Sequence, residues 1–166
     1  MIGIWTAVFL AGQGGEIYTL ANDLEQSQSR VFKAIRDILL ASPLLTDSAD
    51  ITATKITFRS TGTTIIAVAN DYSGFSGANP TLNIYDELAY YTSESSRRLW
   101  DEGLPSPARK ISFRLAVSTA GFEDEPSPLL DIYNRVVKGG AELVAPDLYQ
   151  QGNSLVYWTH KPHAPW

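Results

Sequence analysis

The chain has 166 residues, the size of one domain, and its 44% hydrophobic and 19% charged residues are ordinary for a globular protein. A formal net charge of -5 excludes the basic field that dominates nonspecific DNA affinity, so any grip on nucleic acid would depend on another domain or subunit. The absence of cysteine excludes disulfides, cysteine zinc sites and thiol chemistry, which fits a cytosolic protein.

The first expected element is a helix at residues 2–11, apolar throughout and without a capping residue ahead of it. The segment is too short to span a bilayer and has no basic residues before it, so we expect a buried helix rather than a membrane anchor. A glycine-rich turn at residues 12–15 leads into a short strand at 16–21.

A second helix and a hairpin follow. Asp23 can cap a helix that runs to about Leu40 and is ended by Ser42-Pro43. Its apolar side chains at helical spacing are Val31, Ile35, Ile38 and Leu39. Residues 51–59 and 63–69 are rich in β-branched side chains and are separated by Ser60-Thr61-Gly62, which predicts two hairpin strands.

The second half alternates strands and helices. We expect strands at residues 82–87 and 110–117, helices at 93–100 and 127–138, and a last strand at 155–158. Apolar strands that alternate with helices are typical of an α/β protein in which helices cover both faces of a mostly parallel sheet.

Two adjacent carboxylates, Asp86 and Glu87, end the first of these strands. Neighbouring side chains within a strand point to opposite faces, so both can reach one ligand only where the strand leaves the sheet, and open α/β sheets bind ligands at that edge. Asp86 is the shorter and suits Mg²⁺, usually through water, whereas the longer Glu87 suits an attacking water in phosphoryl transfer. The alternative is a solvated acidic turn that caps the next helix.

A second candidate site is Ser118-Thr119-Ala120-Gly121, directly after the strand at 110–117. Small hydroxyl side chains at a strand end can hydrogen-bond a phosphate oxygen or the attacking water, and glycine lets the backbone approach closely. Alone, this segment would be an ordinary turn. Its order and spacing after Asp86 make the two together more specific.

The remaining charged and aromatic residues select no site. Tyr85, Tyr90, Tyr91 and Trp100 are expected in the core or at an interface, and His160 and His163 have metal-like spacing without a third ligand. An arginine that neutralises transition-state charge cannot be chosen from the candidates. They are Arg30, Arg59, Arg97, Arg98, Arg109, Arg114 and Arg135.

Taken together, these segments resemble the ATPase domain of the large terminase subunit of tailed bacteriophages along nearly the whole chain. The strand at 16–21 and the helix beyond it are similar to those that follow the family's phosphate-loop helix. Asp86-Glu87 resembles its Walker B end, and residues 118–121 resemble its coupling motif. The other matching residues are Gln26 or Gln28, Val31-Phe32, Ser42-Pro43-Leu44, Asn79-Pro80 and Leu88, with residues 158–166 similar to the start of the lid or linker.

The resemblance implies a P-loop NTPase-like fold of the catalytic-glutamate class that uses ATP and Mg²⁺. Asp86 would hold the metal, Glu87 would be the catalytic carboxylate, and Ser118 to Gly121 would relay the phosphate state. The implied role is in the motor that packages viral DNA into the procapsid, in the bacterial host cytoplasm. The implied partners are double-stranded DNA, the portal protein, the small terminase subunit and other copies in a ring.

The departures from the family concern both ends. No Gly-x-x-x-x-Gly-Lys-Ser/Thr (Walker A) loop occurs in the chain, and the resemblance would place it just before Met1. Residues 1–150 would then be a partial ATPase core, and 151–166 the start of a linker toward a nuclease domain.

Without that loop and its strand, the strand at 110–117 would have an unpaired edge. We therefore expect the isolated chain to be aggregation-prone or to need a partner segment, and to hydrolyse ATP poorly if at all. Two alternatives stay open: a non-catalytic remnant or interaction module that keeps the fold, and another P-loop ATPase such as a helicase.

Overall fold

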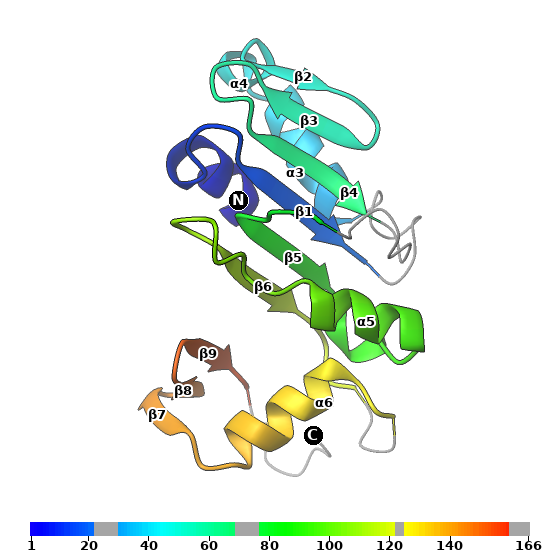
Figure 1. The fold of residues 1–166 in the computed structure, drawn as a ribbon, viewed down its shortest axis with the longest axis vertical. Helices are drawn as coiled ribbons and strands as arrows, with labels where there is room; N and C mark the ends of the chain where they lie inside the picture. The colour runs from blue at the N-terminus through cyan, green and yellow to red at the C-terminus, as the bar shows by residue number, and fades with distance from the viewer. Residues whose placement is uncertain (22–29, 69–76, 122–124, 160–166) are drawn as a thin grey trace.

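A six-stranded sheet forms the centre of the molecule, with the strand order β2-β3-β4-β1-β5-β6 (Figure 1). The computed structural model describes residues 1–21, 30–68, 77–121 and 125–159. The strands are β1 (Glu16–Leu20), β2 (Ala49–Ile51), β3 (Lys55–Phe58), β4 (Thr64–Val68), β5 (Leu82–Asp86) and β6 (Phe113–Val117). β1, β4, β5 and β6 are parallel, while β2 and β3 add an antiparallel edge. The expected mostly parallel sheet is confirmed.

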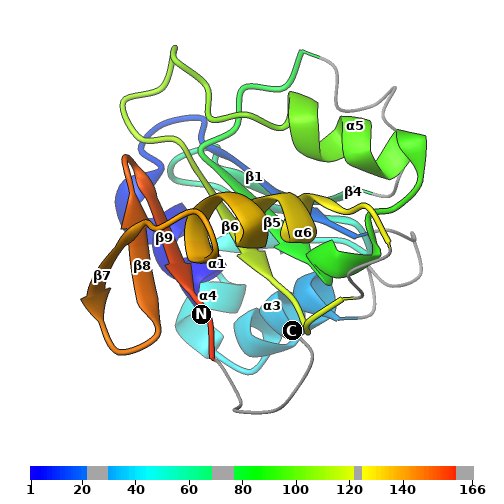
Figure 2. The same ribbon diagram turned by 90° about the horizontal axis from the view of Figure 1, so that it is seen from below.

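Helical segments cover both faces of this sheet, as expected. Figure 2 shows α5 on one side of the strands and α1, α3 and α4 on the other. α6 is drawn across the strands in this view, and its Leu129 and Ile132 pack against the same cluster as α5. The first group comprises η3 (Leu88–Tyr90), α5 (Glu94–Glu102) and α6 (Pro128–Ile132), which continues as η4 (Tyr133–Val137). The second comprises α1 (Ile2–Trp5), which continues as η1 (Thr6–Leu10), α3 (Val31–Leu40) and α4 (Pro43–Thr46). None of the described helices is long and apolar enough to cross a membrane.

Each face of the sheet has its own apolar core. On one face, Ile17 and Ile84 of the central strands pack with Phe32 of α3 in a cluster that also holds residues of α1. On the other, Leu20 and Tyr85 pack with η3 and α5. β1 and β5 are buried on both faces, so burial does not alternate along them, and even Thr19 and Asn83 are buried.

The aromatic side chains near Asp86 and Glu87, the acid pair, belong mainly to the second core. Tyr85 and Tyr91 are fully buried, and the Tyr85 ring packs edge-on against Trp100 at 4.8 Å between centroids. The guanidinium of Arg114 lies 3.8 Å from the centre of the Trp100 ring. Tyr90, by contrast, is 46% exposed. Tyr85, Tyr91 and Trp100 thus pack in the core, as expected.

The predicted burial of the amino-terminal helix was wrong, and α3 is buried along only part of its apolar stripe. The amino-terminal helix is only half-buried: Ile4 faces the core, whereas Trp5 and Phe9 are 53% and 70% exposed. In α3 the buried stripe includes Phe32, and Ile38 is 37% exposed. Both differences arise because a helix on an open sheet packs one stripe and leaves its other apolar side chains in solvent. Asp23, the expected cap, lies outside the described residues.

The predicted strand at residues 51–59 is also wrong, because a turn divides it into the end of β2 and β3. The Thr52 hydroxyl accepts a hydrogen bond from the Lys55 backbone N–H at 3.0 Å, which closes that turn. The hairpin of β3 and β4 is confirmed, and Gly62 in its turn has a positive φ of 66° that glycine adopts without strain. Side-chain caps from Ser93 and Ser127 start α5 and α6, close to the expected helix starts at residues 93 and 127.

A second, separate sheet of three antiparallel strands follows α6. Its strands are β7 (Glu142–Ala145), β8 (Leu148–Gln151) and β9 (Ser154–Tyr157), and the sequence predicted the third of them. The ring of Trp158, just after β9, packs 4.7 Å from that of Tyr133 in η4. The expected division at residue 150 falls inside β8. The assignment of residues 151–166 to a linker stays a prediction, and His160 and His163 lie outside the described residues.

Candidate functional site

The candidate site lies at the edge of the sheet where β1, β4, β5 and β6 all end. These strands are parallel, so their carboxyl ends meet there, and Asp86 at the end of β5 pairs in register with Val117 at the end of β6. The backbone N–H of Glu87 still donates to the Val117 carbonyl at 2.8 Å. Asp86-Glu87 and Ser118 to Gly121 therefore follow two adjacent strands, where the sequence placed them.

Glu87 has an unusual backbone conformation, with φ 56° and ψ 50° in the left-handed region. A non-glycine residue pays a steric cost there, of about 1–3 kcal/mol in strained cases, and such residues cluster at functional sites. Its carbonyl accepts a hydrogen bond from the Tyr90 N–H at 2.9 Å, which folds the chain into η3. The strand thus leaves the sheet within one residue, as two adjacent carboxylates at one site require.

Both carboxylate oxygens of Glu87 have partners from distant parts of the sequence. Oε1 lies 3.2 Å from Nη1 of Arg30, directly before α3, and Oε2 accepts a hydrogen bond from the Thr119 hydroxyl at 3.1 Å. The Glu87 side chain is 22% exposed. The structure therefore joins the predicted carboxylate to the predicted relay segment, residues 118–121. It also adds an arginine that no local sequence pattern selects.

The relay segment also contacts the turn that follows Glu87. The Ser118 hydroxyl accepts a hydrogen bond from the Ala89 N–H at 3.0 Å and donates to the Thr119 carbonyl at 2.7 Å. A Cβ on Gly121 would lie 3.0 Å from the Cβ of Ala89, so any larger residue would push this turn away. Ala120 is exposed. A movement of residues 118–121 would therefore displace the Glu87 side chain through these contacts.

The surroundings of Asp86 change its pKa. Burial, with a further contribution from the negative charge of Glu87, raises the pKa of Asp86 above its ordinary value, and the positive charge of Arg30 opposes this rise. A nearby cation favours the ionised form of such a paired, partly buried carboxylate.

The donor set fits a magnesium ion held together with a nucleotide. Among the described residues, no group of three or more His, Cys, Asp or Glu side chains could hold a metal by itself. Mg²⁺ keeps several waters and commonly uses one or two carboxylates together with substrate phosphates. Asp86, with Glu87 beside it, supplies such a carboxylate edge.

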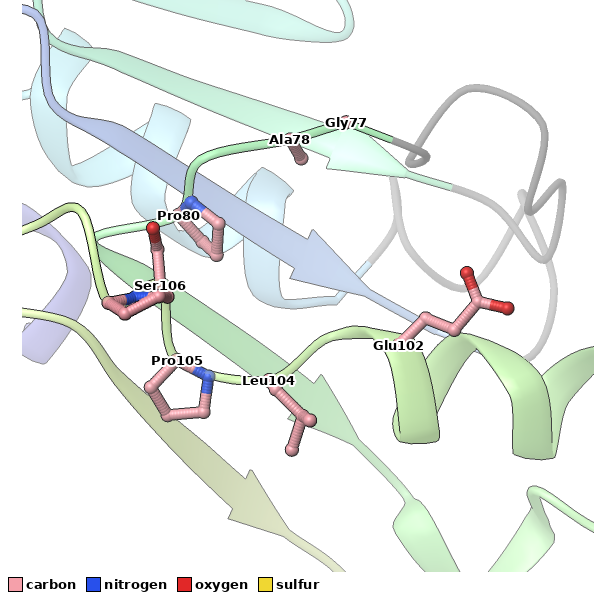
Figure 3. A pocket seen from close by; sticks show the side chains of 8 residues that line it. Gly77, Ala78, Pro80, Glu102, Leu104, Pro105 and Ser106 are labelled. Carbon is pink, nitrogen blue, oxygen red and sulfur yellow. The ribbon is translucent and has the colours of Figure 1, made fainter.

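The small hollow shown in Figure 3 is a separate feature. It measures about 230 Å³ and lies between Gly77, Ala78 and Pro80 on one side and Glu102 and residues 104–107 on the other. Ligand pockets usually measure ~300–1,000 Å³. Neither carboxylate of the acid pair lines the hollow, so we do not assign it to the candidate site.

The similarity of this chain to known proteins lies in its fold. No protein-family model matches the sequence, and no curated protein matches it. Among solved structures, the chain is similar to the crystal structure of the HK97 bacteriophage large terminase, with a TM-score of 0.65 and 20% sequence identity over 83% of this chain. The chain therefore has the α/β fold of part of that terminase. It spans 29% of that protein's length.

Proposed function

We propose that this chain supplies the Walker B and coupling elements of an ATP-hydrolysing motor that packages viral DNA into a procapsid. The observation that carries the proposal is Glu87: a carboxylate in a strained left-handed conformation at a strand end, hydrogen-bonded by Thr119 from the adjacent strand end. The similarity of the fold to a phage large terminase supports the same role.

Each candidate residue has a distinct task in this proposal. Bound Mg²⁺ would neutralise phosphate charge, and Asp86 is the residue that would hold it, through water. Glu87 orients the attacking water and accepts its proton. The relay of the phosphate state is the task of Ser118, Thr119, Ala120 and Gly121. The contacts of this segment with Glu87 and Ala89 transmit any displacement to the acid pair.

The proposed motor needs more than this chain contains. No phosphate-cradling loop occurs in the sequence, so other residues must bind the β- and γ-phosphates. β6, within the described residues, pairs with β5 alone and leaves a backbone edge where a further strand could add. The proposed partners are double-stranded DNA, the portal protein, the small terminase subunit and neighbouring copies in a ring, in the cytoplasm of a bacterial host.

The test is DNA-stimulated ATP hydrolysis by the polypeptide translated from the whole open reading frame that encodes these residues. Glu87→Gln should lower kcat by about 10²–10⁴-fold, the usual contribution of a positioned general base. ATP binding, followed with a fluorescent analogue, should persist in this variant. The matched control is Glu94→Gln in the first turn of α5, which should leave hydrolysis unchanged.

Either of two results would contradict the proposal. Hydrolysis by Glu87→Gln at the rate of the unsubstituted protein would show that Glu87 is not the catalytic carboxylate. No detectable ATP binding or hydrolysis by the unsubstituted protein, with or without DNA, would favour a non-catalytic remnant or interaction module.

A further inference from the structure

Arg30 is the one described cation whose ion pair reaches the acid pair at the end of β5. Its Nη1 lies 3.2 Å from Oε1 of Glu87, and its charge also acts on Asp86. The Arg30 side chain is 54% exposed, so it can leave this position without uncovering a core. Exposed ion pairs contribute little to stability, because solvent and salt screen them.

This geometry puts Arg30 in competition with a divalent cation. A magnesium ion at Asp86 would bring two positive charges close to the place where one already sits, and like charges at a few ångströms repel. The second oxygen of Glu87 faces no such conflict, since its partner is the neutral hydroxyl of Thr119. One of the two contacts to Glu87 is therefore sensitive to metal binding and the other is not.

We propose that Arg30 is a latch that neutralises the acid pair in the resting protein and is displaced when the metal–nucleotide complex binds. Displacement frees Oε1 of Glu87 to accept a hydrogen bond from the attacking water. Oε2 stays bound to Thr119, so the carboxylate remains attached to the relay segment. Arg30 is a positioning residue in this scheme, and the inference rests on the function proposed above for Asp86 and Glu87.

The latch can be tested without measuring catalysis, in the polypeptide translated from the whole open reading frame, by titrating Mn²⁺ as a magnesium substitute in the presence of saturating ADP and following protein-bound Mn²⁺ by electron paramagnetic resonance. Arg30→Gln should tighten binding at the Asp86 site by about tenfold at low salt, because one repelling charge is removed. The gain should shrink as ionic strength rises. Arg30→Lys keeps the charge and should stay close to the unsubstituted protein.

Two further variants make the result specific. Asp86→Asn identifies which part of the Mn²⁺ binding belongs to the site, since that part should disappear. Arg59→Gln is the matched control: Arg59 is similarly exposed, at 58%, but pairs with Asp50 on the far edge of the sheet, so its loss should not change binding at the site.

The possible results separate the latch from the proposed function. Tighter binding in Arg30→Gln alone supports the latch. Equal or weaker binding in Arg30→Gln, with the Asp86-dependent component still present, overturns the latch and leaves the role of Asp86 intact. Absence of an Asp86-dependent component in every variant removes the metal role of Asp86, and the latch with it.

Discussion

The six-stranded sheet and the three-stranded sheet of β7, β8 and β9 are built in opposite ways. In the larger sheet, Ile17, Ile65 and Leu82 have no exposed surface, and helices cover both faces. In the smaller one most residues are exposed, including Leu155 and Tyr157 at 65% and 68%. A three-stranded sheet is at the lower limit of independent stability and depends on what it packs against.

The difference between the two sheets explains why the candidate site lies on the larger one. Glu87 adopts a strained conformation, which lasts only where the surrounding structure holds it firmly. It follows a strand that is paired on both sides and buried on both faces. In the small sheet Asp147 also has a positive φ, of 59°, but it lies in the tight turn between β7 and β8, and aspartate tolerates this conformation in turns. The acid pair therefore sits on the rigid part of the chain.

The largest effect is expected from a substitution in the core of the main sheet. Phe32 of α3 is fully buried against that sheet, so Phe32→Ala should lower the free energy of unfolding by about 3–5 kcal/mol. Denaturant unfolding measures the change. Phe9→Ala removes the same side chain from a 70% exposed position and should cost no more than about 0.5 kcal/mol. Equal losses for the two variants would show that the core is misplaced.

A smaller and local effect is expected where the second sheet meets the helix before it. Trp158→Ala removes the ring that packs on Tyr133, a contact between aromatic rings that contributes about 0.5–1.5 kcal/mol beyond buried area. Amide hydrogen exchange should speed up in β8 and β9 while protection in β1 and β5 stays unchanged. Tyr157→Ala, at a 68% exposed position, is the control. Equal acceleration in both sheets would mean that they unfold as one unit.

The smallest effect concerns Asp86 and depends on pH. Because burial raises the pKa of Asp86 in the folded protein, ionised Asp86 opposes folding at neutral pH, and this cost disappears below the pKa of the unfolded chain. Asp86→Asn should therefore raise the melting temperature at pH 7 and lose that advantage below about pH 4. Asp101→Asn, on α5, controls for the change in net charge. Stabilisation of Asp86→Asn that is the same at both pH values would contradict this account.

Much of the main sheet could be predicted from the sequence because its elements have local causes. The apolar residues of β1 and β5 mark short strands, and Ser93 and Ser127 stand where the two expected helices begin. The turn inside residues 51–59 escaped detection because β-branched residues continue through it and Thr52 closes it with a side-chain hydrogen bond. β7 and β8 escaped because their exposed faces lack a clear apolar pattern.

For the candidate site, the sequence by itself determined which carboxylates and hydroxyls end two neighbouring strands, since strand ends and residue types are local properties. Only the tertiary structure decided which of the eight arginines meets Glu87, and that Thr119 rather than Ser118 donates to it. Arg30 and Glu87 are 57 residues apart, and their contact exists because α3 and β5 pack in the same layered core. A contact between distant segments depends on how the whole chain folds, which no local pattern records.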